Sequence, residues 1–231
     1  MTEIPPFRAT HEFEGTFINE RHRSYSTCPA KEHLLDLGID GWLRREDALK
    51  LYELAYFAVG PILEIGSYHG LSTSILAGAA KDSGRGQRIV SVELDVAAQD
   101  VARKHLQRLD LAPDVSFIQA DAESFCDRAA AAGEQFDFVF VDHDHSYAAV
   151  LPVCRQMASL VPEGGFVLLH DWLDARNFAP GAEDYGVFGA TIDGLDPLKF
   201  DFYGAFGVTG LFRKQAGGSG FAQLKMLKTL G

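Results

Sequence analysis

The sequence predicts an α/β domain of the doubly wound kind, in which a mostly parallel sheet is covered by helices on both faces. One observation is that short apolar, β-branched or aromatic runs alternate five times with segments of helical composition between residues 62 and 170. Such runs are typical of buried parallel strands, and their alternation with helices indicates crossover connections. A second observation is that only a glycine-rich turn separates the last two runs, which predicts a closing antiparallel hairpin.

Seven strands and five helices make up this prediction. The strands are expected at residues 62–65, 88–93, 115–119, 136–141, 166–170, 199–203 and 208–213. The helices are expected at residues 44–58, 71–81, 96–109, 122–132 and 147–160. The first helix repeats apolar residues at helical spacing and ends just before Gly60 and Pro61, so it leads directly into the first strand.

The length suits one domain with terminal extensions. The chain has 231 residues, of which 47% are hydrophobic, and this is enough to form a core of its own. Residues 1–40 show no clear period and are expected to form a partly helical N-terminal arm. Residues 41–215 are expected to form the α/β domain. The sequence Gly-Gly-Ser-Gly at residues 217–220 predicts that residues 216–231 form a flexible joint followed by a short amphipathic tail.

The composition disfavours several kinds of partner. A formal net charge of −11 opposes binding to nucleic acid or to an anionic membrane surface, and fits a small neutral or cationic substrate better. The three cysteines are widely spaced without a CxxC pattern, which indicates reduced thiols. No signal-peptide pattern is present, and no apolar run approaches the roughly 20 residues of a membrane span. We therefore expect a cytoplasmic protein, and a homodimer is compatible with these features.

The stretch ILEIGSYHGLST at residues 62–73 runs from the first strand through a glycine-rich turn at residues 66–70 into a helix. Ligands bind at such strand-to-helix turns in open α/β sheets. Gly66 and Gly70 allow a ligand to approach the backbone closely and allow a positive φ angle. Hydroxyl groups near the helix start, where exposed N–H groups favour an anionic group, belong to Ser67, Ser72 and Thr73.

The spacing of this turn distinguishes between two classes of cofactor. A dinucleotide-binding turn has the pattern G-x-G-x-x-G, whereas this turn has G-x-x-x-G with Tyr68 in the place of the second glycine. Acids follow at the ends of the next two strands. Glu93 is positioned to accept hydrogen bonds from both ribose hydroxyls, with Asp95 as the alternative. Asp121 is positioned to accept a hydrogen bond from the adenine amine or to cap the next helix, two compatible roles.

The pattern E-x-G-x-x-x-G, followed by these two acids, resembles the core of class I S-adenosylmethionine-dependent methyltransferases. The resemblance extends over residues 41–171, and GWL and LYELA upstream of the turn are similar to a bacterial branch that includes O-methyltransferases of macrolide sugars and other natural products. It implies a Rossmann-like seven-stranded sheet, S-adenosylmethionine as the methyl donor and a small-molecule acceptor. The cofactor-binding residues that it implies are Glu64, Gly66, Ser67, Tyr68, Gly70, Ser72, Thr73, Glu93, Asp121, Ala122 and Asp142.

Polar residues follow the fourth and fifth strands, at the sheet edge where catalysis is expected. They lie in DHDHSY at residues 142–147 and LHDW at residues 169–172, and both motifs are similar to those of the same branch. Methyl transfer requires an aligned acceptor whose oxygen is made more nucleophilic. His145 is expected to be a general base, with His143 as the alternative, because the pKa of histidine lies near neutrality. Asp142 is expected to orient His145 or to contact the cofactor, and helix capping is the non-catalytic alternative for His145.

A divalent metal is the second route to activation of the acceptor. Asp142 and Asp171 are similar to two metal ligands of catechol O-methyltransferase-type enzymes, but Trp172 stands where those enzymes have an asparagine as third ligand. His170 could supply the missing ligand, and an imidazole favours Mn, Fe or Zn over Mg. The hypothesis is therefore that Asp142, His170 and Asp171 bind one divalent ion. Without an ion, Asp171 would cap the segment that follows its strand.

Aromatic side chains are candidates for the wall of an acceptor pocket. They are Tyr25, Trp172, Phe178, Tyr185 and Phe188. The same side chains fit a hydrophobic core equally well, and the sequence does not distinguish between these two positions.

The sequence thus predicts an S-adenosylmethionine-dependent methyltransferase that methylates an oxygen of a small molecule containing a sugar, polyol or phenol, with nitrogen as the alternative acceptor atom. Two other classes remain. An NAD-dependent oxidoreductase or epimerase is disfavoured by the missing middle glycine and by the absence of a Tyr-x-x-x-Lys pair after the fourth strand. A non-catalytic nucleoside-binding module is disfavoured by the acids and histidines that follow the fourth and fifth strands.

Overall fold

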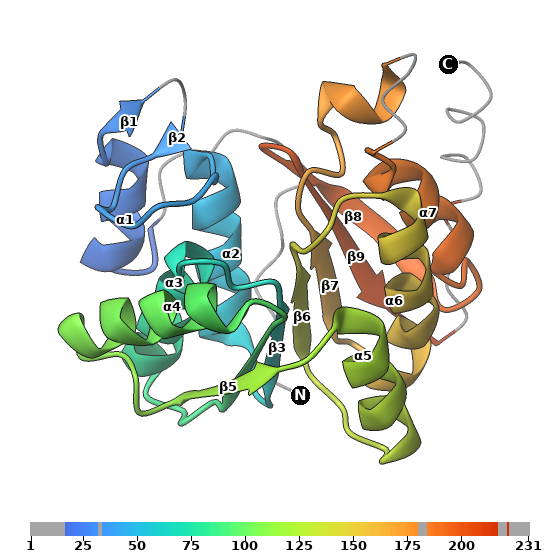
Figure 1. Ribbon diagram of the computed structural model, residues 1–231, viewed down its shortest axis with the longest axis horizontal. Coiled ribbons are helices and arrows are strands. Elements are labelled where there is room, and N and C mark those ends of the chain that lie inside the picture. Colours follow the sequence, from blue (N-terminus) through green and yellow to red (C-terminus); the bar gives the residue numbers. More distant parts are fainter. Residues whose placement is uncertain (1–16, 32–33, 180–183, 217–220, 222–231) are drawn as a thin grey trace.

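The computed structural model describes residues 17–31, 34–179, 184–216 and 221 (Figure 1). Residues 1–16 of the expected arm lie outside the described residues. The same holds for the glycine-rich joint at residues 217–220 and for the tail beyond Phe221. Within the described part of the chain, no helix is both long enough and apolar enough to span a membrane.

A seven-stranded mixed sheet runs through the centre of the molecule (Figure 1). Its strand order is β5-β4-β3-β6-β7-β9-β8. The strands are β3 (Ile62–Ile65), β4 (Ile89–Glu93), β5 (Val115–Gln119), β6 (Phe138–Val141), β7 (Phe166–Leu169), β8 (Phe200–Phe206) and β9 (Thr209–Lys214). Pairing is parallel from β5 across to β7, whereas β9 is antiparallel to both β7 and β8. The predicted doubly wound sheet with a C-terminal antiparallel hairpin is confirmed.

Helices cover both faces of this sheet, α1 to α4 on one side and α5 to α7 on the other (Figure 1). They are α1 (Glu20–Thr27), α2 (Arg45–Phe57), α3 (Leu71–Ser83), α4 (Val96–Arg108), α5 (Ala122–Ala131), α6 (Tyr147–Leu160) and α7 (Val187–Gly194). Successive strand residues point to opposite faces. Ile62 and Phe138 therefore belong to the core beneath α2 and α3, whereas Leu63 and Val139 belong to the core beneath α5 to α7.

The C-terminal hairpin differs in detail from the prediction. A turn was expected at residues 204–207, but β8 continues through Gly204 to Phe206 and the chain reverses at Gly207. The register shifts between Phe202 and Gly204, because Gly204 adopts a φ of +142° that forms a bulge inside the strand. Gly204 therefore marks a bulge within β8. The expected start of the turn, at residue 204, was wrong, because the turn begins three residues later.

The described part of the N-terminal arm packs on the domain. Arg21 Nε lies 2.8 Å from Asp82 Oδ2 in α3, and the Tyr52 hydroxyl of α2 donates to the same carboxylate at 2.6 Å. His22 Nε2 lies 3.1 Å from the Leu49 carbonyl oxygen. After α1 the chain forms two short strands, β1 (Ala30–Lys31) and β2 (Leu34–Leu35), and then an extended segment that leads into α2. These elements carry no strong sequence period, so the sequence predicted only a partly helical arm.

Candidate functional site

The carboxyl ends of the parallel strands surround a cavity of about 810 Å³. Two parts of the chain outside the sheet contribute to its wall. Leu34 and residues 40–44 lie before α2, and Asp171, Asp174, Arg176 and Tyr185 lie after β7. We call the part beside the tips of β3, β4 and β5 the cofactor end. The part beside the tips of β6 and β7 is the chemical end. The position agrees with the rule that open α/β sheets bind ligands outside the carboxyl ends of their strands.

The glycine turn lies at the cofactor end. Gly66 has a φ of +92°, and a side-chain carbon there would overlap the backbone carbonyl of Asp142. Gly70 begins α3 with a φ of +91° and lies against Ala102 of α4, with only 3.0 Å available to a side-chain carbon. Tyr68 also has a positive φ, +42°, and lines the cavity. Packing of neighbouring segments therefore requires both glycines, in addition to any ligand.

Glu93 holds the backbone of the same turn. Its Oε2 accepts hydrogen bonds from the N–H groups of Ser67 at 3.2 Å and Tyr68 at 2.8 Å. Its Oε1 accepts one from the N–H of Asp95 at 2.9 Å. Asp95 itself caps α4 by accepting from the Ala97 N–H at 2.8 Å and does not line the cavity. Glu93, the first choice for the ribose contact, is thus the better placed of the two acids.

Asp121 combines the two positions that the sequence left open. Its Oδ1 accepts a hydrogen bond from the Ser124 N–H at 2.9 Å and so caps α5, and this bond lowers the pKa of the carboxyl. Asp121 and Ala122 also line the cavity beside the tip of β5. Asp121 therefore caps α5 and lines the cavity at the same time.

Three residues that the resemblance implied for the cofactor do not line the cavity, namely Glu64, Gly70 and Thr73. Glu64 is fully buried beneath the turn. Its two oxygens accept hydrogen bonds from the hydroxyls of Ser72 and Thr73, both at 2.6 Å, and of Ser91 at 2.7 Å. Burial raises the pKa of Glu64 to about 7 in spite of these bonds. Its observed position supports the turn from below.

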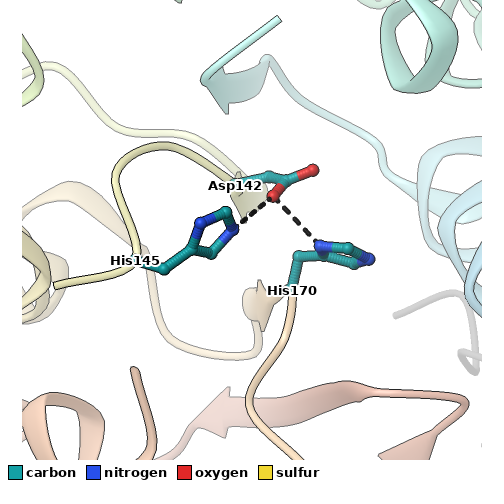
Figure 2. Close-up of side chains that lie close together, drawn as sticks. All are labelled: Asp142, His145 and His170. Atoms are coloured by element: carbon teal, nitrogen blue, oxygen red, sulfur yellow. Dashed lines mark hydrogen bonds and ion pairs between the residues drawn. The ribbon is translucent and has the colours of Figure 1, made fainter. Parts of the chain in front are cut away.

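Asp142, His145 and His170 converge at the chemical end (Figure 2). Asp142 follows β6, His145 lies in the loop before α6, and His170 follows β7. Asp142 Oδ1 lies 3.0 Å from His170 Nδ1 and 3.3 Å from His145 Nε2. Asp171 lies beside them, with Oδ1 3.6 Å from His170 Nδ1 and Oδ2 3.4 Å from His145 Nε2. The two strand tips thus bring two carboxylates and two imidazoles around one point.

The charges in this cluster are strongly coupled. Burial opposes a positive charge on His170, but Asp142 first, and then Asp171 and Asp47, raise its pKa to about 10. Burial likewise opposes ionisation of Asp142, yet His170 and His145 hold its pKa well below its usual range. The two shifts together favour the charged forms of His170 and Asp142.

Asp47 is a member of the cluster that sequence reasoning missed. It lies in the first turn of α2, is 1% exposed, and its Oδ2 lies 3.8 Å from His170 Nε2. Its oxygens accept hydrogen bonds from the N–H groups of Arg44 and Val208, both at 2.9 Å. Burial raises its pKa to about 6. In the sequence Asp47 is typical of an acid that caps a helix, and no local signal distinguishes that role from a contact with a strand tip far along the chain.

Tyr185 covers the cluster from outside. Its hydroxyl donates to Asp171 Oδ2, and its ring stacks on His145 with centroids 5.1 Å apart and an interplanar angle of 11°. Arg176 lies over the other face of the ring, its guanidinium carbon 4.1 Å from the centroid. Asp171 has a φ of +53°, an uncommon conformation for a residue other than glycine. The segment after β7 thus fixes the outer side of the chemical end.

The predicted aromatic residues occupy different environments. Tyr185 lines the cavity, and the other four do not. Tyr25, Trp172 and Phe188 are buried in the core, whereas Phe178 is exposed. Three of the five predicted aromatic residues thus belong to the hydrophobic core, which was the alternative to an acceptor wall. His143, the alternative base, lines the cavity, its buried Nε2 has no hydrogen-bond partner among the described residues, and burial lowers its pKa to about 4.

The comparisons with known proteins agree with this arrangement. No curated protein is significantly similar in sequence to the chain. Residues 63–172 match the family model of a methyltransferase domain. They contain the glycine turn, Glu93, Asp121 and every residue of the cluster except Asp47. The chain therefore contains a methyltransferase domain.

Solved structures show the fold that the methyltransferase shares. The O-methyltransferase TomG from Streptomyces achromogenes, in complex with SAM, is 22% identical, with a TM-score of 0.60 over 75% of this chain and 82% of that chain. The methyltransferase PaMTH1 from Podospora anserina, bound to SAH, is 17% identical, with a TM-score of 0.60 over 76% and 80%. An O-methyltransferase from Bacillus cereus, in complex with SAH, is 20% identical, with a TM-score of 0.57 over 84% and 88%. The methyltransferase therefore has the class I, Rossmann-like fold.

Proposed function

We propose that this methyltransferase transfers a methyl group from S-adenosylmethionine to an oxygen of a small-molecule acceptor. The observation that carries the proposal is the cluster of Asp142, His145 and His170, which lies on the wall of the same cavity as Glu93 and Asp121. Two of the similar structures are described as O-methyltransferases, and they contain SAM or SAH. A net charge of −11 favours a small acceptor over a nucleic acid.

The cofactor end supplies groups for each part of a nucleoside. Glu93 already accepts three backbone N–H groups, but two carboxylate oxygens have about four acceptor positions, so one remains for a ribose hydroxyl. Asp121 is placed to accept from the adenine amine. Ser67 Oγ is buried on the cavity wall and has no hydrogen-bond partner among the described residues. Further contacts are proposed for Gly66, Tyr68, Ser72, Ala122 and Asp142, which line the same cavity.

S-adenosylmethionine would supply a methyl group on a positively charged sulfur, from which in-line displacement leaves neutral S-adenosylhomocysteine. The chain contributes by holding donor and acceptor in line, an effect that reduces the barrier of a two-substrate reaction by several kcal/mol. Asp142 belongs to the cluster, and its backbone carbonyl packs against Gly66 of the turn. It would therefore contact both the donor and the acceptor. We propose that residues 41–215 carry this activity, with residues 34–40 completing the wall.

The donor set fits a divalent metal. Donors bound to one ion at about 2.0–2.2 Å lie roughly 3.0–3.5 Å from one another. Asp142 Oδ1 lies 3.0 Å from His170 Nδ1 and 3.3 Å from His145 Nε2, and the three candidate ligand atoms all lie within 4.8 Å of one another. His170 Nδ1 is buried without a well-formed hydrogen bond, as expected of a nitrogen directed at an ion. We propose Asp142, His145 and His170 as ligands, with Asp171 adjacent.

Two imidazoles with carboxylates suit Mn, Fe or Zn better than Mg or Ca. A bound ion would lower the pKa of an acceptor hydroxyl and make its oxygen a better nucleophile. The chain itself fixes the donors. Tyr185 holds Asp171 by a hydrogen bond, and Asp47 and Asp142 flank the His170 ring. Because His145 Nε2 faces two carboxylates, its position favours a ligand over a free general base.

Binding and turnover together test this function. Calorimetry should show micromolar binding of S-adenosylhomocysteine and no response to NAD, whereas tight NAD binding would contradict the proposal. Elemental analysis of the purified protein should find a bound transition metal. Activity should disappear in EDTA and return with a divalent ion. Full turnover in EDTA would instead leave His145 as the base, and binding of the nucleoside without transfer to any acceptor would indicate a non-catalytic module.

A further inference from the structure

An extended segment crosses the wall of the cavity just before α2. Leu35 donates its N–H to the Leu43 carbonyl at 2.7 Å, and Arg44 has extended backbone angles, φ −83° and ψ 164°. Leu43 is 2% exposed, whereas Trp42 on one side of it is 61% exposed and Arg44 on the other side is also exposed. Alternation along an extended chain therefore directs Trp42 and Arg44 away from the core. Both line the cavity.

Trp42 is part of an aromatic surface at the cavity. Its ring lies 5.6 Å from the ring of Tyr68, at an angle of 33°. The Tyr68 hydroxyl donates to Asp40 Oδ2 at 3.2 Å, which fixes the ring beside the cavity. Tyr68 is 40% exposed, so both rings keep open area. A flat ring gains stacking energy on such a surface at little cost in conformational entropy.

Arg44 differs from the other charged groups that line the cavity. The acids there have protein partners: Glu93 and Asp144 accept backbone N–H groups, Asp40 accepts from Tyr68, and Asp171 accepts from Tyr185. Glu123 is an exception, with no partner among the described residues, and it lies at the cofactor end. In contrast, no described residue forms a hydrogen bond or ion pair with the Arg44 guanidinium.

Arg44 is also placed toward the chemical end. The only other Lys or Arg among the described lining residues is Arg176, whose Nε lies 2.8 Å from Asp174 Oδ1 and which is therefore neutralised. The pKa of Asp174 is lowered chiefly by its hydrogen bond with Arg176, and in smaller part by the positive charge of Arg44. Asp174 in turn donates its N–H to the carbonyl of Asp171. The Arg44 backbone N–H donates to Asp47 Oδ2 at 2.9 Å, and the same oxygen lies 3.8 Å from His170 Nε2, so the Arg44 backbone lies near the tip of β7.

We propose that the acceptor is an aromatic compound with a carboxylate, whose ring packs on Trp42 and Tyr68 while the Arg44 guanidinium binds the carboxylate. The inference rests on the proposed function, because it names the acceptor of the same site. A guanidinium presents a planar pair of N–H donors that matches a carboxylate, and an ammonium cannot reproduce this geometry. The overall negative charge of the chain had favoured a neutral or cationic substrate. At the acceptor position, most acids already have protein partners, whereas the Arg44 guanidinium has none among the described residues. An anionic acceptor is therefore favoured there.

The test compares three probes of similar size with different charges: 4-hydroxyphenylacetate, 4-ethylphenol and tyramine. Each is titrated by calorimetry into protein saturated with S-adenosylhomocysteine. We expect the carboxylate to bind roughly tenfold more tightly than the neutral phenol, and tyramine to bind most weakly. Arg44→Gln should abolish the preference and Arg44→Lys should keep part of it. Arg88→Gln, which removes an exposed arginine outside the cavity, should leave all three affinities unchanged.

Trp42 supplies a second measurement. The chain has two tryptophans, and Trp172 is 2% exposed, so a probe that stacks on Trp42 should quench only the exposed one. Trp42→Phe should remove the quenching and keep the charge preference. Equal affinity for the three probes, tighter binding of tyramine, or no binding of the carboxylate to the protein with bound S-adenosylhomocysteine would overturn the inference. Failure to bind S-adenosylhomocysteine itself would count against the proposed function instead.

Discussion

At the cofactor end of the cavity acids are held by backbone N–H groups, whereas at the chemical end acids and histidines hold one another. Glu93 accepts from the turn and Asp121 accepts from the first turn of α5. Asp142, in contrast, has His145 and His170 as its polar neighbours. Main-chain donors stay in place when one side chain changes. A network of charged side chains is expected to rearrange, so each of its members depends on the others.

The largest expected effect is at the chemical end. His145→Ala should reduce turnover by about 10² to 10⁴, because it removes a proposed ligand or base from the reacting centre. Steady-state assays and elemental analysis would measure turnover and metal content together. The affinity for S-adenosylhomocysteine should stay within about twofold, since His145 lies apart from Glu93 and Asp121. A tenfold loss of this affinity would contradict the separation of cofactor binding from the chemical end.

The second effect is the pH dependence of stability in EDTA. The pKa of His170 is about 10 in the folded protein, above the ordinary 6.5, because Asp142 favours its charged form. A raised pKa gives stability that is fully present below pH 6.5 and is lost as the pH rises through about 10. Denaturant unfolding between pH 6 and 10 should show a loss on the order of a few kcal/mol.

Two variants assign this loss to one end of the cavity. Asp142→Asn should flatten the slope, because it removes the main partner of the His170 charge. Glu64→Gln should leave the slope above pH 7 unchanged. The pKa of Glu64 is raised from 4.5 to about 7, so its contribution to stability is lost as the pH rises from 4.5 to 7. A slope above pH 7 that is the same in wild type and Asp142→Asn would contradict the charge network.

The third effect concerns the cofactor end alone. Glu93→Gln should weaken binding of S-adenosylhomocysteine by about tenfold to a hundredfold, because it replaces charged hydrogen bonds with neutral ones. Turnover with saturating cofactor should change much less. Asp95→Asn is the matched control, since asparagine caps a helix as well as aspartate does and Asp95 does not line the cavity. If the two variants lost equal affinity for S-adenosylhomocysteine, the acids would act by stabilising the fold and not by contacting the ligand.

The smallest effect is the difference in coupling between the ends. A double-mutant cycle of Asp142→Asn and His145→Gln should give an interaction energy of about 0.5–3 kcal/mol in the free energy of unfolding. The cycle of Glu93→Gln and Asp121→Asn should be additive within about 0.5 kcal/mol. Chemical denaturation of the six variants and wild type measures both. Similar interaction energies in the two cycles would contradict the difference between the cofactor end and the chemical end.

The sequence predicted those parts of the molecule that depend on neighbouring residues. The strand tips at Glu93, Asp121, Asp142 and Asp171 were located because each acid lies at the end of a predicted strand or within two residues of it. Asp47 was missed, because its contact with His170 joins the start of α2 to the tip of β7 and leaves only a capping pattern in the sequence.

The direction of side chains was also beyond the sequence. Glu64 is the acid of the glycine motif, yet it points beneath the turn toward three hydroxyl groups. Strand alternation fixes only which face a residue takes, and both faces of this sheet are covered. Likewise, the sequence offered Trp172 as a candidate for the acceptor wall and did not single out Trp42, although Trp42 lines the cavity and Trp172 is buried in the core.

The close approach of Gly66 to the Asp142 carbonyl has a consequence for evolution and engineering. The turn that we propose to face the methyl donor and the loop that we propose to carry the acceptor's activating groups meet backbone to backbone at Gly66. Their separation is therefore set once, when the chain folds, and no exchange of side chains adjusts it. New acceptors can be accommodated only by altering the outer walls, at residues 40–44 and after β7, while the distance over which the methyl group travels stays constant.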